Sequence, residues 1–244
     1  MRNVPQDNKV SRNYRREPQM NRTAKEIILN SGKAVGGLML FAVGVYLVIQ
    51  SNLGAQPWDT LMIGLSERMG ILYGNVSVAL SAVLILIDTL ILKEKIGLGT
   101  VLDAITVGKT VDLLNWLGPV PKMTGALIPR IALMLLGFCI EGLAQYIYMK
   151  QSIGYGPRDS LQIGLSRKLK RLSVGGTAVL INVSVLSAGW LLGGPVGVGT
   201  FIAPFGLGFT QQRVFDFMKF NPKTIVNQNI IESFRILSGA SGKD

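Results

Sequence analysis

The sequence contains no histidine and only one cysteine, Cys139, among its 244 residues. Histidine is the commonest general base, a frequent metal ligand and the side chain that titrates near neutral pH. A single cysteine excludes an internal disulfide. The H-E-x-x-H metalloprotease motif requires histidine, and neither a P-loop nor the Gly-x-Gly-Asp motif of intramembrane aspartyl proteases occurs. We therefore expect no enzymatic activity, no cofactor and no metal site.

Charged side chains are missing from two long segments, residues 34–58 and 172–212. Because about 20 helical residues cross the hydrocarbon core of a bilayer, the second segment is long enough for two spans. The composition is 48% apolar, which excludes a disordered chain. The net charge of +11 lies in tails and short connectors, which argues against nucleic acid as a partner. The sequence predicts an all-α polytopic membrane protein whose first partner is the lipid bilayer.

One phrase occurs twice, as NLGAQPWDTLMIGLS at 52–66 and as SIGYGPRDSLQIGLS at 152–166. Eight of the fourteen positions from 53 to 66 are identical in the second copy, and GLGT at 97–100 returns as GVGT at 197–200. A constant offset of this length indicates an internal duplication. It divides the chain into a disordered basic tail, a first repeat, a linker, a second repeat and an amphipathic tail, at residues 1–30, 31–118, 119–130, 131–219 and 220–244.

Each repeat contains three apolar segments long enough to cross a membrane and one short helix. The short helices are expected at 57–69 and 157–170, where only seven uncharged residues separate Asp59 from Glu67. Seven residues make about 10 Å of helix, too little to cross a bilayer. The predicted spans are 34–52, 74–92, 98–117, 131–149, 173–192 and 198–218.

An odd number of spans per repeat requires the second repeat to be inverted relative to the first. The distribution of Lys and Arg agrees with this topology, because positive residues collect in cytoplasmic segments. With both termini inside, 21 Lys and Arg residues are cytoplasmic and three are outside. A reading with eight spans and parallel repeats would place Lys93, Lys95 and Lys150 outside. We therefore expect two inverted repeats in a bacterial cell membrane, with both termini in the cytoplasm.

These segments resemble the YczE/YyaS/YitT family of bacterial integral membrane proteins. The resemblance rests on the basic tail, the first span ending in NLGAQPWDTL, and the later stretch KIGLGTVLDAITVG at 95–108. The second repeat departs from the pattern at Arg158, where the first repeat has Trp58. The family is largely uncharacterised, so the resemblance implies a location and an architecture but supplies no reaction.

The repeated Gly-x-x-Pro-x-Asp pattern is typical of a chain break followed by a helix start. Glycine accepts unusual backbone angles, proline suits the first helical turn, and an acidic residue two positions later is favoured near the helix N-terminus. Three placements fit this pattern: an amphipathic helix in the membrane interface, a re-entrant loop that meets its counterpart near the midplane, and a tilted partial span. A catalytic pair of Asp59 and Asp159 is the least favoured use.

Ionisable groups within the predicted spans are further candidates, because charge in hydrocarbon is costly and often functional. Lys109 and Asp112 are spaced to form an internal pair on one helix face, which would be structural. Glu141 has no basic residue nearby in sequence, and it stands where the first repeat has Phe41, so a role in a lumen or in proton coupling is weighed equally against a structural one. The candidate pathway residues are Gly54, Pro57, Asp59, Thr60, Gly154, Pro157, Asp159, Ser160, Glu141, Asp103, Lys109 and Asp112.

The favoured function is a transporter or channel for a small solute or ion, because inverted repeats with broken segments suit a central pathway. The alternative is a non-transporting membrane partner that supports other proteins, and a membrane enzyme is a distant third. A second copy of the chain or another membrane protein is a further partner candidate. After Pro222, residues Val226, Ile230, Phe234 and Leu237 form one helical stripe, which predicts a cytoplasmic or interfacial amphipathic helix.

Overall fold

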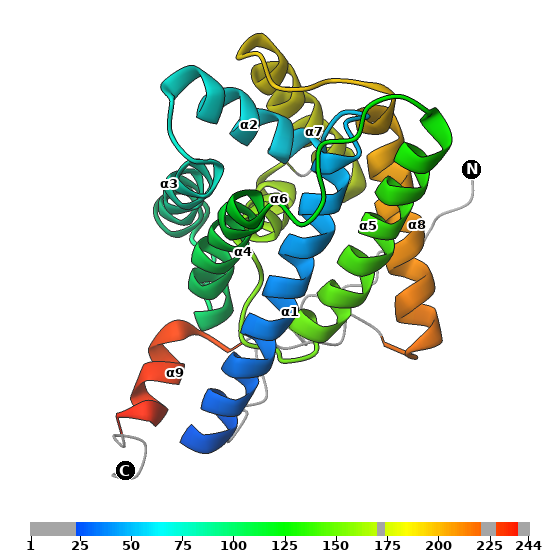
Figure 1. Ribbon diagram of the computed structural model, residues 1–244. Helices are drawn as coiled ribbons and strands as arrows, with labels where there is room; N and C mark the ends of the chain where they lie inside the picture. The colour runs from blue at the N-terminus through cyan, green and yellow to red at the C-terminus, as the bar shows by residue number, and fades with distance from the viewer. Residues whose placement is uncertain (1–22, 170–173, 221–227, 239–244) are drawn as a thin grey trace, which may run out of the picture.

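The computed structural model describes residues 23–169, 174–220 and 228–238, and every regular element in these ranges is a helix. Helices α1 to α8 form one bundle, and α9 lies beside the start of α1 (Figure 1). The elements are α1 (Ala24–Gln50), α2 (Pro57–Met69), α3 (Tyr73–Leu86) with a π-helical continuation (Ile87–Leu92), α4 (Leu98–Leu117), α5 (Leu127–Met149), α6 (Pro157–Lys168), α7 (Val174–Leu191), α8 (Val198–Phe217) and α9 (Ile230–Leu237).

Helix α1 begins earlier than the sequence analysis predicted, so part of the expected disordered tail is ordered. Residues 1–22 of that tail lie outside the described residues, but 24–30 are helical. The cause is a capping box, in which the Glu26 amide donates to Thr23 Oγ1 and the Thr23 amide donates to Glu26 Oε2. Such a box satisfies two amides that a helix start otherwise leaves free. The pattern Thr-x-x-Glu at 23–26 is the signal in the sequence for this helix start.

Three helical segments are long and apolar enough to cross a membrane, judged among the described residues: α1, the continuous stretch Tyr73–Leu92, and α5. Helix α7 is apolar but shorter, and α4 and α8 each have 20 residues with more polar side chains. The predicted starts at 57, 98, 157 and 198 are confirmed. The α3 segment contains a π-helical end that periodicity did not indicate, and it holds the buried Asp88.

Helices α1 and α5 lie side by side and run in opposite directions at the centre of the bundle (Figure 1). They approach each other closely at two glycines. A β-carbon on Gly44 would stand 2.8 Å from the Gly137 carbonyl oxygen, and one on Gly137 would stand 2.9 Å from the Gly44 carbonyl oxygen. Small residues allow such backbone contact between membrane helices. The two helices therefore pack as a close antiparallel pair.

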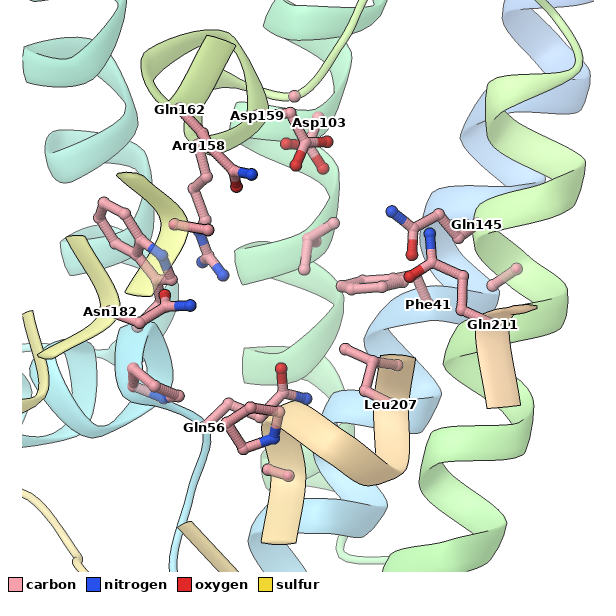
Figure 2. A pocket seen from close by; sticks show the side chains of 18 of the residues that line it. Phe41, Gln56, Asp103, Gln145, Arg158, Asp159, Gln162, Asn182, Leu207 and Gln211 are labelled. Carbon is pink, nitrogen blue, oxygen red and sulfur yellow. The ribbon is translucent and has the colours of Figure 1, made fainter. Parts of the chain in front are cut away.

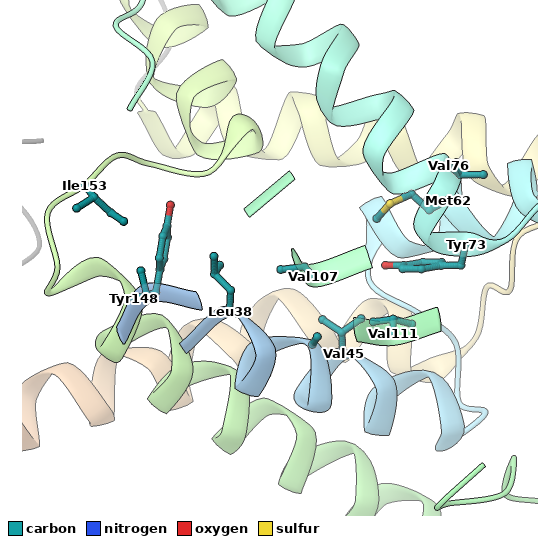
Figure 3. Packing of buried hydrophobic residues seen from close by; sticks show 11 residues of the cluster. Leu38, Val45, Met62, Tyr73, Val76, Val107, Val111, Tyr148 and Ile153 are labelled. Atoms are coloured by element: carbon teal, nitrogen blue, oxygen red, sulfur yellow. The ribbon is translucent and has the colours of Figure 1, made fainter. Parts of the chain in front are cut away.

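The main apolar cluster fills the space between this pair and helices α2, α3 and α4. Leu38 and Val45 of α1 meet Val107 and Val111 of α4, while Tyr148 and Ile153 extend the cluster at one end (Figure 3). A second cluster joins α1, α5 and α8 through Val48, Met134, Phe138, Ala203 and their neighbours. The first cluster fixes the α4 side of the bundle, and the second fixes α8.

The loop in front of each short helix binds the start of a helix in the other half. The Gly99 amide donates to the Ile153 carbonyl at 2.8 Å, and the Gly199 amide donates to the Leu53 carbonyl at 2.7 Å. Both loops turn at a glycine with positive φ, 107° at Gly54 and 136° at Gly154. Side chains rarely adopt these angles, which explains the glycine in each phrase.

The connector 118–126 and the segment 228–237 cover opposite ends of the bundle. At one end, the Tyr46 hydroxyl donates to the Val120 carbonyl at 2.6 Å. At the other, the Ile230 amide donates to the Ile96 carbonyl at 2.8 Å, so α9 is fixed beside the loop before α4. Of the predicted amphipathic stripe, Val226 lies outside the described residues, and Phe234 is 61% exposed.

Candidate functional site

A cavity of about 520 Å³ lies in the middle of the bundle, and every helix from α1 to α8 contributes to its wall (Figure 2). Its polar lining consists of one cationic side chain, two acidic ones, five amides and two serines. These residues are Arg158, Asp103, Asp159, Gln56, Gln145, Gln162, Asn182, Gln211, Ser77 and Ser81. A cavity of this size with convergent polar groups is typical of a small-molecule site.

Both copies of the repeated phrase reach this cavity. Gln56 to Trp58 form the wall on one side, and Gly156, Arg158 and Asp159 form it on another. Further pairs separated by 100 residues also line it, among them 103 and 203, and 107 and 207. Residues that lie 100 positions apart in the sequence thus share one site.

Asp59 and Arg158 connect the two phrases directly. The Arg158 guanidinium lies 3.9 Å from Asp59 Oδ1, and the Tyr73 hydroxyl donates to the same oxygen at 2.9 Å. The guanidinium also stands over the Trp58 ring, 5.5 Å from its centroid. Asp59 is 2% exposed, so these contacts replace the water that its carboxylate would otherwise bind.

Asp59 and Asp159 lie in the first turns of α2 and α6, near the helix N-termini as the sequence predicted. Gln56 and Gly156 are the residues that precede the first turns, and neither helix start receives a hydrogen bond from a capping side chain. The Asp59 carboxylate instead turns towards Tyr73 and Arg158. Asp159 lines the cavity. The sequence could not reveal the partners of Asp59, because they come from other helices.

Asp103 and Asp159 lie together at one end of the cavity, on either side of Gly156. A β-carbon on Gly156 would stand 2.8 Å from Asp103 Oδ2 and 3.8 Å from Asp159 Oδ2. In Figure 2 both carboxylates lie near Gln162, whereas the Arg158 guanidinium extends away from them towards Asn182. Glycine at 156 therefore leaves the space into which Asp103 projects.

Glu141 is completely buried and is held by the first phrase. The Gln56 side-chain amide donates to both of its oxygens, at 2.9 and 2.8 Å. Gln56 also lines the cavity, so it joins the Glu141 carboxylate to the cavity wall. The absence of a basic residue near Glu141 in sequence is consistent with this arrangement, because its partner is a neutral amide from the loop before α2.

Lys109 and Asp112 do not form the predicted internal pair. Lys109 Nζ donates to Asn75 Oδ1, and Asp112 Oδ1 accepts from the Gly74 amide at 2.8 Å. Both contacts join α4 to the start of α3, and neither residue lines the central cavity. The i,i+3 spacing places the two residues on one face of α4, but each of them binds a residue of α3 and not the other.

The remaining predicted residues lie in the loops before the two short helices and in the first turns of these helices. Pro57 lines the cavity and Gly54 lines a second one, described below. Pro157 begins α6, and Thr60 and Ser160 are buried in the first turns of the two short helices. The amides Gln145, Gln162, Asn182 and Gln211 were missed. Their signal was an uncharged polar residue within an apolar stretch, which is weaker than a charge.

A second, smaller cavity of about 240 Å³ lies beneath the connector 118–126. Polar side chains from α1, α2 and α4 line it, and so does Lys122 of the connector. Tyr73 also borders this cavity, while its hydroxyl binds Asp59. The Tyr73–Asp59–Arg158 group therefore stands between the second cavity and the central one.

The fold and the cavity define a helical membrane protein with a polar interior site. The chain belongs to a family described as "Family of unknown function (DUF6198)", whose model matches residues 32–215. This agrees with the predicted YczE/YyaS resemblance. The matched residues run from within α1 to within α8, so they include the connector and every residue that lines the cavity.

Three relatives support this assignment. The chain is 28% identical to the uncharacterized membrane protein YczE of Bacillus subtilis over 180 residues, covering 73% of this chain and 81% of that protein. It is 30% identical to an uncharacterized protein of Haemophilus influenzae over 175 residues, covering 72% and 78%. It is 27% identical to YyaS of Bacillus subtilis over 168 residues, covering 68% and 82%. No solved structure matches the chain significantly.

Proposed function

We propose that this protein transports a small polar solute across the bacterial cell membrane. The observation that carries the proposal is the convergence of both repeated phrases on one cavity, where Arg158 of the second phrase approaches Asp59 of the first. A site at the interface of two repeats, near broken helices, is the arrangement of many secondary transporters. The likeness is one of architecture, so the function requires a direct test.

The proposed topology has six spans in two inverted repeats. Its support is the antiparallel pair α1 and α5, which occupy equivalent places 100 residues apart and cross at Gly44 and Gly137. The exchanged hydrogen bonds of Gly99 and Gly199 have the same two-fold relation. Two equivalent antiparallel helices require an axis perpendicular to their length, hence within the membrane plane. Both termini are then cytoplasmic.

Within this topology the short helices α2 and α6 are re-entrant. An interfacial placement would put the two phrases on opposite membrane surfaces, about 30 Å apart. Their shared cavity and the 3.9 Å approach of Arg158 to Asp59 favour the re-entrant placement. Cysteines replacing Pro57 and Pro157 test it, because a disulfide forms only where Cα atoms come within about 7 Å.

The test of transport is access to the cavity from both faces of the membrane. Gln145→Cys in a Cys139→Ser background gives a thiol at the cavity wall. Membrane-impermeant methanethiosulfonates should modify it in right-side-out and in inside-out vesicles. Lys95→Cys and Lys122→Cys report the cytoplasmic and outer faces. Modification of the Gln145→Cys thiol from one face only would contradict transport.

The alternative function is a non-transporting partner that supports other membrane proteins. The observation in its favour is the exposed apolar side of α9, where Ile231 and Phe234 are 72% and 61% exposed. We also propose that the protein has no enzymatic activity. Truncation after Met218 separates the two functions, since a docking role would be lost while access to the cavity from both faces would persist.

A further inference from the structure

The charges around the central cavity are unequal. Arg158 is the one cationic side chain in its described lining, against Asp103 and Asp159. Arg158 already faces the Asp59 carboxylate at 3.9 Å. Asp103 and Asp159 form no hydrogen bond or ion pair with any described residue. The site thus has one guanidinium for three carboxylates, of which Asp59 is buried and Asp103 and Asp159 are half-buried. Carboxylates partly withdrawn from water are stabilised by a nearby cation or by a proton.

The lining around the two carboxylates suits an organic cation better than a metal ion. No group of three or more His, Cys, Asp or Glu side chains able to hold a metal occurs in the described part of the chain. Five amide side chains and the rings of Phe41, Trp58 and Tyr148 complete the wall. Amides bind the polar groups of an organic molecule, and aromatic faces attract ammonium groups.

Two largely buried serines on the cavity wall independently indicate a ligand. Ser77 and Ser81 of α3 are 4% and 7% exposed and line the cavity, yet neither hydroxyl bonds to a described residue. Ser184 and Ser187 of α7 behave differently, because each donates to the carbonyl one turn earlier at 2.8 Å. Buried polar groups usually have partners, so the α3 hydroxyls are available to something inside the cavity.

We propose that the central cavity binds a small organic cation whose ammonium or guanidinium group contacts Asp103 and Asp159, and whose polar body contacts the amides and Ser77 and Ser81. The inference rests on the proposed function of this cavity as a solute site and adds the class of solute. Arg158 then has two roles: it neutralises Asp59, and it repels the cationic group from its own side of the cavity, which orients the ligand.

The test measures charge selectivity at a cysteine beside the two carboxylates, in the purified full-length protein in detergent, where both faces are accessible. Gln162→Cys in the Cys139→Ser background supplies the thiol. It is modified by trimethylammonioethyl or by sulfonatoethyl methanethiosulfonate, and each rate is divided by that reagent's rate with 2-mercaptoethanol. The normalised cationic rate should be about tenfold higher, the factor for roughly 1.4 kcal/mol of attraction.

Asp103→Asn and Asp159→Asn, alone and combined, should remove most of this preference. Asp216→Asn is the matched control, because Asp216 is exposed on α8 and its carboxylate accepts only from the Gln212 side chain among described residues. Elution as a single peak on size exclusion shows that each variant is folded. Equal normalised rates for the two reagents, or a preference that survives both substitutions, would overturn the proposal.

Competition then tests the ligand class with four probes of similar length. 1,4-Diaminobutane should slow the modification of the Gln162→Cys thiol by N-ethylmaleimide at least severalfold. 4-Aminobutanoate, succinate and 1,4-butanediol should protect less. Stronger protection by 4-aminobutanoate would replace the cation by a zwitterion, and stronger protection by succinate would refute cation binding. Cationic selectivity without access from both membrane faces would refute transport and leave the inference standing, whereas the reverse result would refute the inference alone.

Discussion

The two halves of the bundle, residues 24–117 and 127–217, differ most where their last two helices meet. In the first half α3 and α4 touch through backbone, since a β-carbon on Gly108 would stand 2.7 Å from Ser77 Cβ and 3.0 Å from Gly74 Cα. In the second half the equivalent Gly208 has nothing within 4 Å and lines the cavity. Related sequences thus form a closed helix pair and an open one.

This difference explains where the cavity lies. Residues of α7 and α8 supply a large part of its wall, whereas α3 and α4 contribute fewer. The sequences differ at the position facing Gly108, because Gly74 corresponds to Val174, and a pair of small residues favours helix contact. In the proposed transporter, two inverted repeats exchange such closed and open states. Each prediction below tests or refines this contrast.

The largest effect is expected from placing a large side chain where α3 and α4 are in contact. Gly108→Leu should force α3 and α4 apart and destabilise the protein by about 3 kcal/mol, at the upper end of overpacking costs. Gly208→Leu should cost little, because no atom lies within 4 Å of its β-carbon position. Thermal unfolding in detergent, followed by size exclusion, measures both. Equal loss of stability would show that the second half closes in the same way as the first.

The second effect concerns the two equivalent acids. Asp59→Asn weakens the contacts of a buried carboxylate with Tyr73 and Arg158, so we expect a loss of about 1.5–3 kcal/mol, the range for hydrogen bonds to charged groups. Asp159→Asn should leave the unfolding midpoint close to that of the unchanged protein, because Asp159 has no hydrogen bond to a described residue. The same thermal measurement compares them. A larger loss for Asp159→Asn would contradict its position on the open cavity.

The third prediction compares how readily a thiol reagent reaches two equivalent positions of the halves. Val111 and Gln211 are equivalent positions on α4 and α8, but Val111 is completely buried and Gln211 lines the cavity. In the Cys139→Ser background, Gln211→Cys should react with N-ethylmaleimide at least about tenfold faster than Val111→Cys, because thiol reactivity depends on exposure. Mass spectrometry over time gives both rates. Similar rates would mean that the two halves exchange states faster than the reagent reacts.

The sequence predicted the helices well and the site only in outline. The starts of α2, α4, α6 and α8 followed from glycine and proline positions, which are local signals. The offset of 100 residues identified the phrases that meet at the cavity. The partners were not predictable, because Asp59–Tyr73 and Gln56–Glu141 join different helices and depend on packing.

The sequence also could not predict that α3 and α4 touch at Gly108 while Gly208 faces open space. Both copies carry a glycine at the equivalent places 108 and 208, and a repeat suggests equal environments for equal residues. Whether a glycine meets backbone or open space depends on the neighbouring helix. Of the two expected intramembrane features, the Lys109–Asp112 pair was wrong, whereas Glu141 remains a candidate because Gln56 joins it to the cavity wall.

The smallest effect compares the two loop contacts that hold the halves together. Thr100 Oγ1 donates to the Tyr155 carbonyl at 2.5 Å, a contact between the halves. Thr200 Oγ1 accepts from the Gly197 amide at 3.2 Å, and Thr100 Oγ1 accepts from Gly97 in the same way.

Valine has nearly the same shape as threonine but no hydroxyl. Thr100→Val should therefore cost about 1 kcal/mol more than Thr200→Val, the net value of one hydrogen bond. Unfolding midpoints of the two variants in the same detergent measure the difference. Equal midpoints would show that the two loop contacts are equivalent and would confine the asymmetry of the halves to α3–α4 and α7–α8.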